Sequence, residues 1–222
     1  MAAAAATAFR AGLSYLPPTV ENMTDLRAFH REALDVARTV VGAVDAAALD
    51  VSTPCSAWTL DRLLAHMTGQ NHGFAASARG GTQNIGIWAD RPVGAEPAKV
   101  FGESAADVAA AFAEDGVLER GFWLPEIRDD CLFPASLAIG FHFVDTVVHA
   151  WDVAKSLGVT VEFDAPLLDA VLPIALAVPG GSSRLAEGAA FRPAREVAPG
   201  ASTLDQVVAV LGRDPQWTPA AR

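Results

Sequence analysis

The segment FHFVDTVVHAWDVAKSLG, residues 141–158, is apolar on nearly every side of a helix, but between residues 142 and 149 it carries one acid and two imidazoles, Asp145, His142 and His149. A buried charge without a partner is costly, so such groups need a counter-charge, a bound ion or access to water. Asp145 and His149 are one helical turn apart on the same face, so both can reach a single ion. The sequence therefore indicates either a metal site or a buried ion pair between these two residues.

A metal site needs a third ligand from another helix, and His66 is the best candidate. It lies in the middle of the segment TLDRLLAHMTGQNHGFAASARGG, residues 59–81, on the flank of an apolar stripe. Two histidines and one carboxylate leave coordination positions open for water or substrate, as in a catalytic rather than a structural site. We therefore predict a metal bound by His66, Asp145 and His149.

The other histidines are less suited to the same ion. His142 shares the face of Asp145 and His149, but it lies about 10 Å along the axis from His149. We expect it to stand behind the ligands or to face the substrate, and we include it among the catalytic candidates. His30 is expected to be a packed or hydrogen-bonded core histidine, and His72 to lie on the surface.

The elements that position these residues are predicted to be mainly helical. Thr24 is expected to cap a first helix, Thr59 caps a second that Gly80 and Gly81 end, and Gly158 ends a long helix that starts near Pro134. The remaining expected elements are a surface loop over 82–95, a helix over 97–116, an irregular stretch over 116–134 with a short extended excursion, a short strand within 158–166, and helices over 165–178 and 203–211. This pattern predicts a four-helix bundle, residues 21–158, preceded by a tail, 1–20, and followed by a small extension, 159–222, that packs on it.

Composition narrows the classes of partner. The 222 residues carry 16 Lys and Arg against 26 Asp and Glu, a formal net charge of -10 that disfavours nucleic acid. No apolar run reaches the roughly 18 to 20 residues that span a bilayer. The N-terminal MAAAAATAF lacks the features of a secretory signal, and two cysteines are too few for a disulfide framework. We expect a cytoplasmic protein with a small-molecule substrate; whether it forms a homodimer stays open.

Three stretches resemble one known family. STPCSAWTLDRLLAHM (52–67) is similar to the first signature of the actinobacterial DinB-like proteins related to mycothiol-dependent maleylpyruvate isomerase. VDTVVHAWDVAKSLG (144–158) resembles the second signature, and VVAVLGRDPQW (207–217) the usual C-terminal ending. The resemblance implies a DinB-like four-helix bundle and a divalent metal held by His66, Asp145 and His149. The better-known isomerase has a glutamate in place of Asp145, which leaves the identity of the metal open.

The resemblance also implies a low-molecular-weight thiol, mycothiol, as co-substrate. A zinc-like ion lowers the pKa of a bound thiol, so that the thiolate exists at neutral pH and can add to an electrophile. Release of the thiol after bond rotation gives isomerisation, and its retention gives S-transfer. Zinc is the expected metal, with nickel or iron as alternatives; iron in such a site would support oxygen chemistry.

Two other classes of function remain. The pocket could serve a lyase, cyclase or isomerase of secondary metabolism, with Asp145 and the histidines as acid and base and no essential metal. The protein could also bind a metal or a small ligand without catalysis.

Three further residues have simpler expected roles: Asp152 fixes the helix by a hydrogen bond, Cys55 is buried and inert, and Arg213 either closes over the bundle or anchors the tail.

Overall fold

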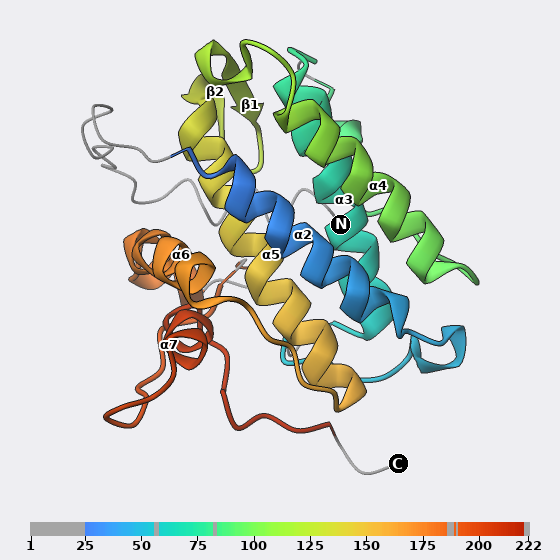
Figure 1. Cartoon of the computed structure of the whole chain (residues 1–222), viewed down its shortest axis with the longest axis vertical. Helices are drawn as coiled ribbons and strands as arrows, with labels where there is room; N and C mark the ends of the chain where they lie inside the picture. The colour runs from blue at the N-terminus through green and yellow to red at the C-terminus, as the bar shows by residue number, and fades with distance from the viewer. Residues whose placement is uncertain (1–24, 56–57, 82–83, 186–188, 190, 220–222) are drawn as a thin grey trace.

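The structure is a computed structural model, and it describes residues 25–55, 58–81, 84–185, 189 and 191–219. Four long helices form its body: α2 (Arg27–Gly42), α3 (Leu60–Ala78), α4 (Pro97–Phe112) and α5 (Ala135–Leu157). Helix α2 packs on α4 and α5, and α3 packs on the same two helices, which gives the bundle seen in Figure 1. The described chain is thus a mainly helical bundle, as the sequence predicts.

Local sequence signals explain where the helices begin and end. The Thr59 hydroxyl accepts a hydrogen bond from the backbone N–H of Arg62 and caps α3. Gly158 ends α5 in the left-handed region with φ of 68°, a conformation that costs a glycine little. Helix α2 begins at Arg27, and the cap expected at Thr24 lies outside the described residues.

The sequence predicts short extended backbone in two segments, and the structure has strands in the first of them. The irregular stretch after Gly116 contains a short turn of 3-10 helix, η4 (Val117–Glu119), and then an antiparallel hairpin of β1 (Gly121–Leu124) and β2 (Arg128–Pro134). The strand expected within residues 158–166 is wrong, because the backbone there runs as a loop from Gly158 to Asp164 without a pairing partner in the described chain. A strand needs a neighbouring strand to pair with, and the periodicity of a sequence does not show whether such a neighbour exists.

The described part of the loop expected over 82–95, residues 84–95, lies mostly at the surface as predicted, with Trp88 and Val93 as buried exceptions. It contains η3 (Ile85–Trp88), and the Trp88 side chain is buried against Gly73 of α3. A Cβ atom on Gly73 would lie 2.4 Å from the Trp88 ring, so only glycine admits the indole at this distance. The packing of Trp88 on Gly73 therefore holds the loop against α3.

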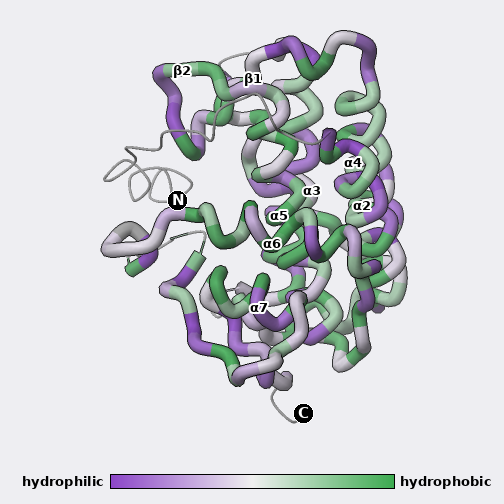
Figure 2. The backbone as a smooth tube through the Cα atoms, turned by 60° about the vertical axis from the view of Figure 1, so that its left-hand side comes forward, coloured by the Kyte–Doolittle hydropathy of each residue, from purple (hydrophilic) through white to green (hydrophobic). Residues whose placement is uncertain are grey.

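The remaining helices lie beside the bundle. A short turn, η2 (Ala46–Ala48), follows α2, and α6 (Ala165–Ala177) packs on α5 and α2. After η5 (Ser182–Leu185), α7 (Thr203–Val210) packs on α6. Figure 2 shows the hairpin near one end of the molecule and α7 toward the other. No helix in the described ranges is long and apolar enough to cross a membrane.

Candidate metal centre

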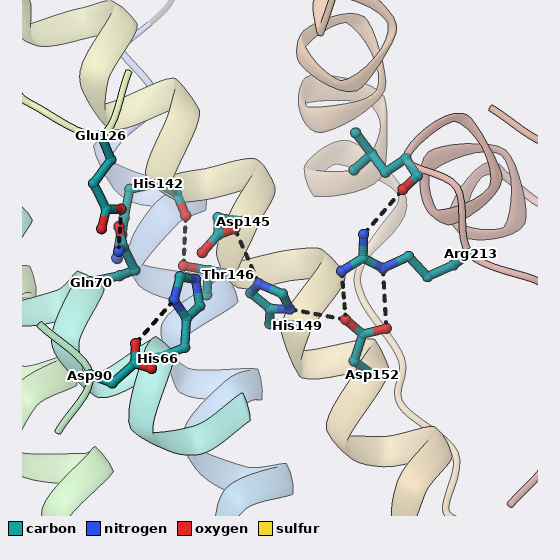
Figure 3. A network of polar contacts seen from close by, with 11 residues as sticks. His66, Gln70, Asp90, Glu126, His142, Asp145, Thr146, His149, Asp152 and Arg213 are labelled. Atoms are coloured by element: carbon teal, nitrogen blue, oxygen red, sulfur yellow. Dashed lines mark hydrogen bonds and ion pairs between the residues drawn. The ribbon is translucent and has the colours of Figure 1, made fainter. Parts of the chain in front are cut away.

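Three side chains from two neighbouring helices converge between α3 and α5. His66 of α3 and Asp145 and His149 of α5 each offer one ligand atom, and these atoms lie within 4.8 Å of one another. Figure 3 shows the three side chains turned toward a common space. Solvent reaches that space, because the side chains of His66 and Asp145 keep 20% and 23% of their exposure. The structure thus brings together the three residues that the sequence analysis selected.

His149 is held by a carboxylate on each side of its ring. Its Nε2 lies 3.3 Å from Oδ1 of Asp145, and its Nδ1 lies 2.9 Å from Oδ2 of Asp152. Asp152 therefore fixes Nδ1 as the donor nitrogen and leaves Nε2 directed at Asp145. This arrangement also agrees with the hydrogen-bonding role expected of Asp152.

His66 has a looser set of neighbours. Its Nδ1 lies 3.7 Å from Oδ1 of Asp90, in the loop after η3. The Trp58 ring lies against the imidazole with 4.8 Å between ring centroids, and the His149 ring meets His66 edge-on at 5.5 Å. The contact with Asp90 leaves Nε2 of His66 as the nitrogen available to an ion.

The charges of the site are strongly coupled. Burial alone would lower the pKa of His149, but Asp145 and Asp152 outweigh it and raise that pKa to about 9. Burial alone would raise the pKa of Asp145, but attraction to His149, and then to His66, holds it below its usual range. Without a bound cation, Asp145 and His149 are therefore an ion pair, and a metal must displace a proton from His149 to bind.

The donor set itself fits a divalent transition metal. Two imidazoles and one carboxylate on two rigid helices are donors that zinc, nickel and iron accept, and the facing side is open. Asp152 supplies the outer carboxylate that metal-binding histidines usually have. The residues present are thus compatible with the metal that the sequence indicates, and also with the ion pair alone.

His142 is not part of this cluster. Its Nδ1 lies 2.7 Å from Nε2 of His30, and both rings are buried. Its other contacts are aromatic, with Phe74 at 4.5 Å between ring centroids. Burial lowers the pKa of His142 to about 4, which keeps the ring neutral at physiological pH. The His142 side chain is buried, and His142 and Asp145 line the same cavity of about 10 Å³; a catalytic role for His142 stays a prediction. His30 is the hydrogen-bonded core histidine that its position predicts.

Two acids close to the site, Asp90 and Glu126, are not marked by any pattern in the sequence. Glu126 lies between β1 and β2 and accepts a hydrogen bond of 2.8 Å from Nε2 of Gln70, one turn after His66 on α3. Burial raises the pKa of Glu126, an effect that the Gln70 hydrogen bond opposes. Both acids lie in loops or turns, where no periodicity marks them, and only the packing of those loops on α3 brings them near His66.

The other residues considered from the sequence lie in surroundings that give them structural rather than catalytic roles. Arg213 is buried and pairs with Asp152, with Nη2 3.0 Å from Oδ2, so it ties the C-terminal extension to α5. Burial raises the pKa of the Cys55 thiol to about 11, in keeping with an inert cysteine. Trp151 is packed in the core.

Fold and cluster together define a helical bundle with a two-histidine, one-carboxylate set at its centre. The chain belongs to the family described as the mycothiol maleylpyruvate isomerase N-terminal domain, whose family model matches residues 29–154.

Other proteins share this fold or sequence. Two uncharacterized proteins, from two strains of Mycobacterium tuberculosis, are each 31% identical over 192 residues, which is 83% of this chain and 95% of theirs. The crystal structure of the mycothiol-dependent maleylpyruvate isomerase superimposes with a TM-score of 0.52 at 14% identity, over 70% of this chain and 68% of that one. A histidine-to-alanine mutant of that isomerase gives a TM-score of 0.55 at 13% identity over the same shares. At this identity the structures establish a common fold.

Proposed function

We propose that this protein is a metal-dependent enzyme that uses mycothiol to isomerise a small electrophilic metabolite or to form a thioether with it. The observation that carries the proposal is the convergence of His66, Asp145 and His149 within 4.8 Å on a solvent-reachable face. Family membership supports the thiol, since the family is described by a mycothiol-dependent isomerase.

Each residue has a defined task in this proposal. His66, Asp145 and His149 would hold the ion, which when bound would lower the pKa of the thiol co-substrate. Asp152 keeps Nε2 of His149 directed at the centre through its contact with Nδ1. The chain does not supply the nucleophile from Cys55, because burial raises the pKa of that thiol to about 11 and leaves almost none of it as thiolate at neutral pH.

The test begins with metal content. We expect about one zinc, nickel or iron ion per chain in freshly purified protein, and loss of that ion in His66→Ala and in Asp145→Ala. His72→Ala is the matched control, because His72 lies on the same helix α3 but outside the cluster. A wild-type protein that stays free of metal after reconstitution with all three metals would overturn the proposal.

The second stage separates the two reactions. Metal-loaded protein is mixed with mycothiol and an electrophile such as maleylpyruvate, and free thiol and substrate are followed together. Isomerisation consumes substrate while free thiol returns to its starting level, whereas S-transfer consumes both in equal amounts.

The ion pair favours one alternative. Asp145 and His149 in contact at 3.3 Å, with His149 charged, are a carboxylate and an imidazolium placed for acid–base chemistry without a metal. A lyase, cyclase or isomerase of this kind would keep its activity after chelation, and the metal-dependent enzyme would lose it.

A further inference from the structure

We propose that Asp90 is a positioning residue for His66, and that Trp58 and Arg62 complete an outer clamp that presents this imidazole to the metal. The inference rests on the proposed metal centre. It assigns a role to three side chains that are outside the ligand set.

The clamp is a closed ring of contacts that runs from His66 through Asp90, Arg62 and Trp58 back to His66. The Asp90 carboxylate lies between an imidazole and a guanidinium, with Oδ1 3.7 Å from Nδ1 of His66 and Oδ2 3.6 Å from Nη2 of Arg62. The Arg62 guanidinium in turn lies 5.4 Å from the centre of the Trp58 ring. Trp58 closes the ring against His66, at 4.8 Å between centroids, and it also approaches His149 at 6.2 Å. Figure 3 shows the Asp90 side of this ring.

The loop that carries Asp90 is fixed on both sides of the residue. Before it, the Ala89 carbonyl lies against Gly69 of α3, where a Cβ atom would come within 2.5 Å of the oxygen. After it, the Arg91 backbone N–H donates a hydrogen bond of 2.9 Å to the carbonyl of Ala65, the residue before His66. Asp90 is thus held beside His66 by the backbone, although its own side chain is in contact with solvent.

Each of the two ligand histidines has a carboxylate at its Nδ1, at 2.9 Å for His149 and at 3.7 Å for His66. His149 has Asp152 at its Nδ1, and His66 has Asp90 at the same ring atom. A carboxylate in this position fixes the ring and makes the other nitrogen a better ligand, and removing it typically lowers metal affinity about 10- to 100-fold. The distance of 3.7 Å to Asp90 is longer than a hydrogen bond, so the restraint on His66 is electrostatic and looser than that on His149.

The experiment compares Asp90→Asn with Asp50→Asn, which removes an equal charge from an exposed carboxylate. Zinc dissociation constants are measured by competition with a coloured chelator. We expect binding to weaken about 10- to 100-fold in Asp90→Asn and to stay within twofold of wild type in Asp50→Asn. The cobalt-substituted forms should differ in their visible absorption, because a reoriented His66 changes the ligand field. A merely structural role for Asp90 would leave that spectrum unchanged.

Tryptophan fluorescence tests the other half of the clamp. Trp58 contacts both ligand histidines, so zinc should change the emission of the wild-type protein and should change that of Trp58→Phe much less. Equal affinity and equal spectra in wild type and Asp90→Asn would overturn the inference while leaving the metal centre intact. A wild-type protein without zinc affinity would instead overturn the proposed function on which the inference rests.

Discussion

Arg213 and Asp152 are 61 residues apart in the chain, yet they meet in a buried ion pair directly behind His149. Oδ2 of Asp152 accepts from Nη2 of Arg213 at 3.0 Å and also contacts Nδ1 of His149 at 2.9 Å. Burial alone would raise the pKa of Asp152, but Arg213 and then His149 hold it below its usual range. One carboxylate therefore couples the C-terminal extension to the proposed ligand.

This relationship predicts a split between stability and metal binding. Arg213→Met should lower the free energy of unfolding by about 3 to 5 kcal/mol, because it leaves Asp152 buried with less compensation. The double variant Asp152→Leu, Arg213→Met removes both charges and should recover much of that loss. Its zinc affinity should stay low, because Nδ1 of His149 has lost its partner. Urea unfolding and chelator competition measure the two quantities; a double variant that binds zinc like wild type would contradict the role given to Asp152.

The bundle was predictable because its signals are local. Each signal lies in or directly beside the helix that it defines: the apolar face of α2, the Thr59 cap of α3 and the Gly158 cap of α5. The selection of His66, Asp145 and His149 combined helical spacing with the resemblance, and the structure brings the three together; metal binding by them stays a prediction. The hairpin, Asp90 and Glu126 were not predictable in this way, because their positions follow from how loops pack on α3.

A second prediction concerns that packing. Gly69→Ala should destabilise the protein and weaken zinc binding, since its Cβ would meet the Ala89 carbonyl and displace the loop that carries Asp90. Gly102→Ala in α4 is the control: no atom lies within 4 Å of its added Cβ, and alanine favours a helix over glycine by about 0.5 to 1 kcal/mol. Thermal unfolding should therefore shift down for the first variant and slightly up for the second. The same direction of shift in both would refute the packing argument.

The two cysteines should differ in reactivity. Cys131 is exposed on β2, whereas burial raises the pKa of Cys55 to about 11. Because the thiolate is the reactive form, Cys55 in the folded protein should alkylate about 100-fold more slowly than a free thiol at pH 8. Mass spectrometry after timed alkylation, followed by digestion, assigns the rate to each residue. Fast modification of Cys55 in the folded state would reopen its role as a nucleophile.

The buried pair of His30 and His142 predicts how stability depends on pH. Burial lowers the pKa of both rings, that of His142 to about 4 and that of His30 well below its usual value. His142 and then the charge of Arg31 lower the pKa of His30 further. In the unfolded chain both rings titrate near about 6.5. Between these values the unfolded state binds more protons, so the free energy of unfolding should fall as pH drops from about 6.5 toward 4. For His142 alone the loss is at most about 3 kcal/mol.

This pH range distinguishes the effect of the His30–His142 pair on stability from that of the candidate metal centre. His142 also faces the charges of Asp145, His66 and His149, but the raised pKa of His149 acts in the opposite sense and between pH 6.5 and 9. In the presence of a chelator, urea unfolding at pH 7 and pH 5 should therefore show a loss of stability in wild type that His30→Leu, His142→Leu largely abolishes. The lowered pKa of His72 affects the stability of wild type and of the double variant equally, so the difference between these two proteins reports on the His30–His142 pair. An unchanged loss in the double variant would show that the buried imidazoles do not control acid stability.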